Sequence, residues 1–148
     1  MNSIPPTIRA FFEAAGFAGQ PYKVLEAGES AADVANSIFD QFGGLEVGQC
    51  GLGQEYASSN IRFFKKPKEQ KHIVVAPWKN ALPPLYAIAD AHNDHMMVFV
   101  DSKGQYYFFT DPDEQLYLGG KSFGEAMERL LLGKAYGPAI KRLVLTHL

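Results

Sequence analysis

The chain has 148 residues, the length of one ordinary domain, and no linker divides it, so we expect a single domain over residues 1–148. Apolar residues make up 47%, charged residues 20%, and the net charge is −2. This composition provides material for a core and excludes an overall field that attracts nucleic acid or anionic lipid. The single cysteine excludes an internal disulfide. The lack of a signal peptide or of ~20 consecutive apolar residues predicts a cytoplasmic protein that does not enter a membrane.

Two helices are predicted in the first third of the chain. The first has Ser3 as its cap, two prolines in its opening turn and Gly16 at its end. Ser30, with Asp33 three residues later, resembles a capping box and predicts the start of the second helix. Apolar residues follow that start at a spacing of four, as on one face of a helix: Val34, Ile38 and Phe42.

Two adjacent glycines end this second helix. We expect Gly43 to take a positive φ as the residue that follows the helix. We expect Gly44 to let the chain turn into a short strand at "LEV", residues 45–47. The glycine pair is therefore interpreted as a helix end followed by a strand entry.

From residue 61 the pattern becomes strand-like. "IRFF" and "HIVVA" flank the polar stretch "KKPKEQK" and predict a hairpin or two neighbouring strands. Four apolar runs come next at short, regular spacing, separated by turn residues: "LYAIA", "MMVFV", "QYYFF" and "LYLGG". This spacing predicts an antiparallel meander, which needs no helical crossovers.

A last helix is predicted near the end of the chain. Ser122 and Glu125 form a capping box, and Gly133 closes the helix. The tail "PAIKRLVLTHL" favours either a short helix or an edge strand. Helices near both ends, packed on a central antiparallel or mixed sheet, predict an α+β fold in which the helices cover one face of the sheet.

The turn "DAHNDH" offers four side chains of types that ligate metals: Asp90, His92, Asp94 and His95. A catalytic zinc needs three such ligands and an open position. However, the spacing does not match the H-E-x-x-H motif, and hairpin turns are rich in Asp and Asn for conformational reasons alone. We expect no metal and no other cofactor.

Three further stretches allow a chemical and a structural interpretation. Cys50 is either a nucleophile beside a histidine or a small buried hydrophobe. "GQCGLGQ" lacks the context and the ending of a phosphate-binding loop, which leaves a turn or bulge. A lysine cluster in the loop after residue 64 suits either RNA binding or a solvated hairpin tip, and we favour the tip: Lys65, Lys66, Lys68 and Lys71.

Two stretches suit contact with a protein partner. Trp78 lies among prolines in "APWKNALPPL" and is either a binding hot spot or a ring that covers the core. The acidic turn "TDPDE" is either an ordinary turn or half of a complementary patch for a basic partner.

Several motifs, in order along the chain, resemble the third group of the SUKH superfamily of immunity proteins. They are "AAGF", "FDQFGGLEV", "IADAHNDHMMVFVDSKGQYYFF", "LYLGG" and "SFGEAMERLLLG", over about residues 10 to 133. The most recognisable is the junction after the second helix: Phe42, Gly43, Gly44 and Leu45. The next is the strand–turn–strand motif around Asp101 and Gly104.

The resemblance implies an α+β domain with a non-enzymatic role. Such a protein would bind and occlude a cognate polymorphic toxin, for example a nuclease or deaminase delivered by a competing bacterial cell. Other members of the superfamily act as interaction modules, so a regulatory scaffold is the alternative. A small metal-dependent hydrolase built on "DAHNDH" is a third hypothesis.

Nuclease toxins tend to carry basic clefts, so acidic loops are the first candidates for the toxin-binding surface. The residues that we expect to contact the toxin are five acids and one aromatic anchor: Asp90, Asp94, Asp111, Asp113, Glu114 and Trp78.

Overall fold

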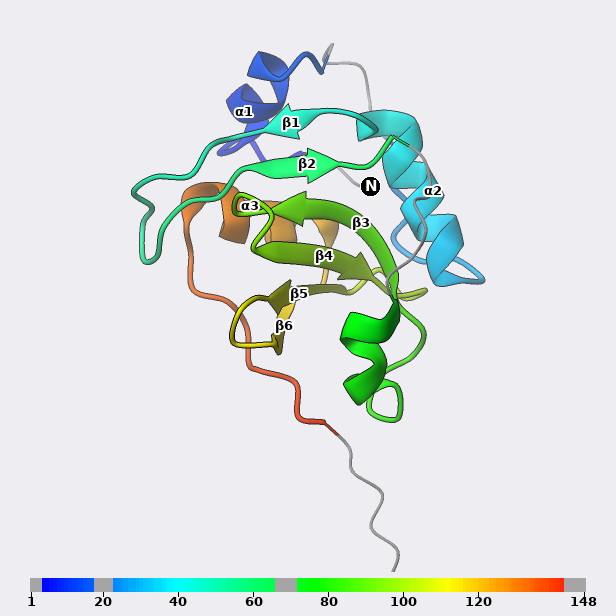
Figure 1. Ribbon diagram of the computed structural model, residues 1–148. Helices are drawn as coiled ribbons and strands as arrows, with labels where there is room; N and C mark the ends of the chain where they lie inside the picture. Colours follow the sequence, from blue (N-terminus) through cyan, green and yellow to red (C-terminus); the bar gives the residue numbers. More distant parts are fainter. Residues whose placement is uncertain (1–3, 18–22, 66–71, 143–148) are drawn as a thin grey trace, which may run out of the picture.

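Six strands form one sheet in a computed structural model of the chain (Figure 1), which describes residues 4–17, 23–65 and 72–142. The strands lie in the sheet in the order of the chain, and every neighbouring pair is antiparallel. The strands are β1 (Glu46–Val47), β2 (Ile61–Phe63), β3 (Tyr86–Ala91), β4 (Met96–Val100), β5 (Tyr106–Thr110) and β6 (Gln115–Gly120). The predicted α+β class is confirmed, and the sheet is antiparallel rather than mixed.

Three helices pack against one face of this sheet: α1 (Arg9–Ala14), α2 (Ala31–Phe42) and α3 (Phe123–Leu132). Buried rings from the helices and from β2 meet between them. The ring centroid of Phe42 lies 5.1 Å from that of Phe12 and 5.2 Å from that of Phe123. It lies 5.5 Å from the ring of Phe63 in β2. One aromatic cluster therefore joins all three helices to the sheet, and its burial stabilises their packing.

Local signals define the start of α2 and the end of α3 as the sequence predicts. The Ser30 hydroxyl accepts a hydrogen bond from the N–H of Asp33, and the Asp33 carboxylate accepts one from the N–H of Ser30, which confirms the capping box. The Ser122 hydroxyl accepts from the N–H of Glu125, which is one of the two bonds of the predicted capping box, while the Glu125 carboxylate pairs with Arg129 at 3.4 Å. Gly133 ends α3 with a φ of +67°.

The two ends of the described chain refine the predictions. Helix α1 begins at Arg9 rather than at the prolines, and its predicted cap Ser3 lies outside the described residues. At the other end, the N–H of Ile140 donates to the carbonyl of Leu116 in β6 at 2.7 Å. Of the two structures expected for the tail, its described part therefore follows the edge of the sheet.

The stretch "HIVVA", predicted as a strand, instead begins a 3-10 helix, η1 (His72–Trp78). Pro77 lies inside this segment and has no N–H to donate to a strand ladder. A 3-10 helix places residues three apart on the same side, and Val75 and Trp78 are both buried. The strand prediction was wrong because the apolar side chains of this run reach the core from one side of a 3-10 helix, and in the described part of the chain the run does not pair with a strand.

Helix η1 covers the second face of the sheet. The ring of Trp78 contacts that of Phe109 edge to face, with 6.1 Å between centroids, and its indole N–H donates to the carbonyl of Ile140 at 2.7 Å. Tyr106, in the same strand as Phe109, contacts Phe123 of helix α3. Because side chains alternate along a strand, Phe109 points away from the three α-helices. The β5 strand is therefore covered on both faces.

The two glycines after α2 have different roles, and the predicted positive φ is at Gly44 rather than at Gly43. Gly43 has a φ of −52°, whereas Gly44 has the positive φ, +85°. A Cβ on Gly43 would lie 2.6 Å from the carbonyl oxygen of Phe39 and 3.1 Å from that of Lys65. Gly43 is therefore needed for close approach between the end of α2 and the strand beside it, and Gly44 is needed for its backbone conformation.

Alanine at either glycine is expected to destabilise the fold. We expect Gly43→Ala to lower the free energy of unfolding by about 2 kcal/mol, because backbone atoms must move to admit the methyl group. Gly44→Ala is expected to cost about 1 kcal/mol for the positive φ. The control is Gly51→Ala, where the nearest heavy atom to the new Cβ lies 3.7 Å away, with an expected change of less than about 0.5 kcal/mol. Urea unfolding measures all three, and equal stabilities of the Gly43 and Gly51 variants would contradict the packing at residue 43.

The turn between β4 and β5 is built around one buried carboxylate. Asp101 is 1% exposed, and its Oδ1 accepts hydrogen bonds from the N–H groups of Lys103 at 2.9 Å and Gln105 at 3.0 Å. Its Oδ2 accepts from the hydroxyl of Tyr107 at 2.9 Å. Burial, and then the charge of Asp101, raise the pKa of Tyr107 above its ordinary value. Gly104 takes a φ of +76° and packs against the carbonyl of Glu26, which leaves no room for a Cβ.

Candidate partner-binding surface

Three turns of the meander lie at the same end of the sheet, because antiparallel strands alternate in direction. Figure 1 shows them at the left of the view. Backbone hydrogen bonds link them: the N–H of His92 donates to the carbonyl of Asn60 at 3.1 Å, and the N–H of Asp111 donates to the carbonyl of His95 at 2.9 Å. We call this surface the acidic end, and it comprises residues 48–60, 92–95 and 111–114 together with the strand ends beside them.

The five acids expected to contact a partner all lie at the acidic end. They are Asp90 at the end of β3, Asp94 in the next turn, and Asp111, Asp113 and Glu114 in the turn before β6. The residues of the last turn are exposed, and the side chain of Asp94 is 62% exposed. The side chain of Asp90 is only 17% exposed. The tertiary structure therefore brings together two turns that are separated along the chain.

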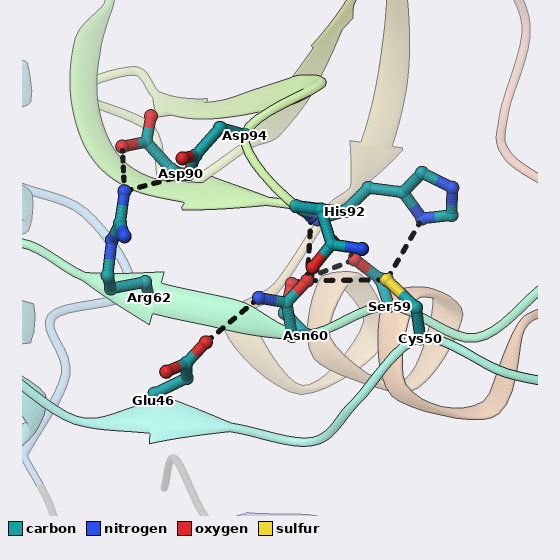
Figure 2. A network of polar contacts seen from close by, with 9 residues as sticks. Glu46, Cys50, Ser59, Asn60, Arg62, Asp90, His92 and Asp94 are labelled. Atoms are coloured by element: carbon teal, nitrogen blue, oxygen red, sulfur yellow. Dashed lines mark hydrogen bonds and ion pairs between the residues drawn. The ribbon is translucent and has the colours of Figure 1, made fainter.

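Arg62 pairs with two of these acids and was not foreseen from the sequence. Its guanidinium lies 3.2 Å from Oδ2 of Asp90 and 2.7 Å from Oδ1 of Asp94 (Figure 2). The hydrogen bond to Asp90, and then the charge of Asp94, raise the pKa of Arg62 above its ordinary value. Its position between Ile61 and Phe63 indicates an outward-facing strand residue. Only the register, which sets Arg62 opposite Asp90, reveals the partner.

The composition of "DAHNDH" is explained by its backbone. His92, Asn93 and Asp94 have φ values of +53°, +53° and +69°. Asn, Asp and His are the non-glycine residues most often found in this region. Asp94 bonds to Arg62, whereas His92 faces Cys50, so the four potential ligands do not converge. Within residues 4–17, 23–65 and 72–142, no three His, Cys, Asp or Glu side chains are grouped so that they could hold a metal ion.

The thiol of Cys50 lies beside an imidazole. It donates to Oδ1 of Asn60 at 3.4 Å and lies 3.9 Å from Nδ1 of His92, and the Asn60 amide donates to Glu46 at 3.0 Å (Figure 2). Cys50 is exposed, so the prediction of a buried hydrophobe was wrong. The thiol donates to the Asn60 amide oxygen at 3.4 Å, and its distance to the imidazole is at the long end for a hydrogen bond to sulfur. The arrangement contributes a polar surface rather than an assembled catalytic pair.

Lysines gather at the opposite end of the sheet. Lys65 follows β2, Lys103 lies in the turn between β4 and β5, and Lys121 follows β6, and all three are exposed. Glu26 also lies there, with its carbonyl against the β4–β5 turn. The remaining lysines of the "KKPKEQK" loop lie outside the described residues. Alternating strand direction therefore places these three lysines at the end of the sheet opposite the acidic turns, although the net charge of the chain is only −2.

Two expected contact residues have structural partners. Asp113 accepts a hydrogen bond from the hydroxyl of Thr110, so part of its role is to shape the turn. Trp78 is 1% exposed, and the guanidinium of Arg142 lies 4.8 Å from its ring centroid. The prediction that Trp78 contacts a partner is therefore wrong. Its ring packs between η1 and β5, which is the alternative of a ring that covers the core.

A protein-family model described as SUKH-3 immunity protein matches residues 9–133 of the chain. Searches of curated proteins and of solved structures give no match. None of the helices in the described part of the chain is long and apolar enough to span a membrane. The matched range runs from the start of α1 to the glycine that ends α3, and thus includes every strand and the acidic end.

Proposed function

The chain belongs to the SUKH-3 immunity protein family, and from this membership we propose that it binds one cognate polymorphic toxin and neutralises it by covering its active surface. On this proposal residues 1–148 form one domain, which acts in the cytoplasm of the cell that it protects. A cytoplasmic location suits this role, because the toxin acts on targets inside the cell.

The acidic end is the observation that supports this proposal most directly. Carboxylates from three chain segments gather there, and most of them are exposed. A nuclease that binds the phosphates of nucleic acid needs a cleft rich in Lys and Arg. An acidic surface opposite such a cleft accelerates encounter and selects the partner. We therefore propose a nuclease as the toxin and the acidic end as the binding surface, with Asp94, Asp111 and Glu114 as its exposed charges.

Neutralisation by covering requires no reaction on the immunity protein. It requires a stable surface whose side chains are held in place before binding, because ordering them on binding would cost affinity. The pairing of Arg62 with Asp90 and Asp94, and the bonds between the turns, hold part of the acidic end in this way. A regulatory scaffold would use a similar surface for a partner from its own cell, so the two functions differ in the partner and not in the fold.

Co-expression tests the proposal. Members of the family are expected to be encoded beside their toxin, so the C-terminal domain encoded by the large open reading frame next to this gene is expressed alone, with the chain, or with an empty plasmid. We expect growth arrest by the domain alone, full rescue by the chain, and co-purification of the two proteins as a one-to-one complex. The scaffold would be favoured, and the immunity role contradicted, if the domain arrests growth while the chain neither rescues it nor co-purifies.

A further inference from the structure

We infer that Leu52, at the tip of the loop of residues 49–57, is the apolar anchor that the acidic end inserts into a pocket on the toxin. This inference rests on the proposed function and names the chemistry of the partner surface. That surface is an apolar pocket bordered by Lys and Arg side chains. No residue of this loop is among the partner contacts expected from the sequence.

The exposure of Leu52 is the first observation. Its relative exposure is 102%, compared with 55% for Tyr56 and 45% for Leu25, the other large hydrophobic residues that are exposed in the described chain. The side chain therefore makes almost no contact with its own protein. Burying a leucine is strongly favourable, so an anchor of this kind gains its full stabilisation only when a partner covers it. A single exposed leucine is ordinary on a protein surface, so its role as an anchor depends on how firmly the loop is held.

The loop that carries Leu52 is held firmly at its base. The N–H of Gln54 donates to the carbonyl of Leu132 at 2.7 Å, and the N–H of Tyr56 donates to that of Gly133 at 2.6 Å. Gly51 and Ser58 exchange backbone hydrogen bonds across the loop at 3.4 and 2.9 Å. These bonds fasten the loop to the end of α3. Because the backbone is ordered before binding, inserting Leu52 would cost little conformational entropy.

Close packing of two glycines fixes the loop further. A Cβ on Gly53 would lie 2.6 Å from the Cα of Gly133, and a Cβ on Gly133 would lie 2.7 Å from the Cα of Gly53. The two backbones therefore touch where side chains would keep them apart. In addition, the N–H of Ala135 donates to the Glu55 carboxylate at 3.2 Å. The loop is thus a rigid projection and its leucine points outward.

The surroundings of Leu52 indicate what it meets. Leu52 borders a recess of about 400 Å³ whose walls include the apolar Phe11 and Leu131 and the polar Gln49 and Gln54. Two residues before it, Cys50 lies 3.9 Å from His92 in the neighbouring turn of the acidic end. The surface thus combines a projecting apolar group, a partly apolar recess, and carboxylates in the same loop and in the neighbouring turn, Glu55 and Asp94. A partner that fits all three presents an apolar pocket, an apolar side chain for the recess and basic residues around them.

Charge argues against a second copy of this chain as the occupant. If two copies met through this surface about a two-fold axis, the same patch would be buried on both, so two sets of carboxylates would share one interface. Like charges placed opposite each other destabilise an interface. A basic partner removes this repulsion, so we assign the surface to the toxin.

Binding measurements on two Leu52 variants test the inference. The probe is the toxin domain from the adjacent open reading frame, titrated by calorimetry with wild-type chain, Leu52→Ala, Leu52→Asp and the control Leu25→Ala. We expect Leu52→Ala to weaken Kd by about 30-fold and Leu52→Asp by more, as for a central hot spot. Leu25 lies at the lysine end near Lys103, so its variant is expected to bind like the wild type. Because Leu52 touches almost nothing in the folded chain, neither variant should change stability.

The results distinguish an error about Leu52 from an error about the immunity role. If wild-type chain binds the domain and both Leu52 variants bind equally well, the anchor is wrong while the immunity role stands. If wild-type chain does not bind, both fail together. If the free chain is a dimer that Leu52→Asp dissolves, the surface belongs to a second copy and the assignment to a toxin is overturned.

The alkylation rate of the single cysteine provides a second test, which uses the wild-type protein. Cys50 is exposed and is the only thiol in the chain. We expect formation of the complex to slow its alkylation by a maleimide at least about tenfold, since a partner seated on Leu52 would cover it. An unchanged alkylation rate in a complex shown to be intact would overturn the inference.

Discussion

Replacing Asp101 by alanine is expected to lower the free energy of unfolding by about 3 kcal/mol, a large part of the total for a domain of this size. The side chain is buried and accepts three hydrogen bonds, from the backbone at Lys103 and Gln105 and from the hydroxyl of Tyr107. Alanine would leave these donors without their acceptor, and an unpaired buried donor costs about 1–3 kcal/mol. The loss concerns stability and not the partner surface, because this turn lies at the lysine end.

Two further variants identify the cause of that loss. Asp101→Asn keeps one acceptor oxygen for the two backbone donors, so a smaller cost of about 1 kcal/mol is expected. Asp113→Ala removes an exposed turn aspartate and is expected to cost less than about 1 kcal/mol. Urea unfolding followed by the fluorescence of Trp78, which is the only tryptophan and is buried, measures all three. Similar stabilities for the alanine variants at 101 and 113 would show that the buried network contributes little.

Reversing three charges at the acidic end is expected to weaken toxin binding by about 100-fold, mostly through a slower association rate. The variant carries Asp94→Lys, Asp111→Lys and Glu114→Lys, whose side chains are exposed. Arg62 keeps Asp90 as a partner when Asp94 is replaced, so the fold should be preserved. The dependence of the association rate on salt should also decrease, because exposed charges are screened by ions.

A variant at the other end of the sheet tests whether the position of the reversed charges matters. It carries Lys65→Glu, Lys103→Glu and Lys121→Glu, an equal number of reversals on exposed residues. We expect less than about a threefold change in Kd, because these residues lie across the sheet from the proposed interface. Surface plasmon resonance at several salt concentrations gives both rates. If the lysine variant loses binding and the acidic variant does not, the toxin binds the opposite end.

Elements with local signals could be predicted from the sequence. Helices α2 and α3 end at residues whose side chains or φ angles terminate a helix through neighbours three or four positions away, as at Ser30 and Gly133. The strands β4, β5 and β6 are joined by short turns, so residues close together in the sequence also determine how these strands pair. The resemblance carried by these same segments led to the family that the comparison then showed.

The errors occur where a distant contact outweighs a local preference. "HIVVA" has the composition of a strand, but Val75 and Trp78 reach the core through a 3-10 turn that packs on β5. Gly43 follows a helix and yet has a negative φ, and the positive φ falls on Gly44, whose N–H donates to the carbonyl of Phe63 in β2 at 3.1 Å. In both cases the deciding contact is with a segment far along the chain, β5 for Trp78 and β2 for Gly44.

The sequence by itself determined the class of fold, most of its helices and strands, the acids of the turns and the family. These depend on side-chain periodicity, caps and turn residues, which act over a few positions along the chain. Only the tertiary structure decided that Arg62 meets Asp90 and Asp94, that Trp78 is buried, and that Leu52 stands fully exposed on a fastened loop beside the acidic turns. Strand register and alternating direction create these relations, and they arise only when segments tens of residues apart pair in the sheet.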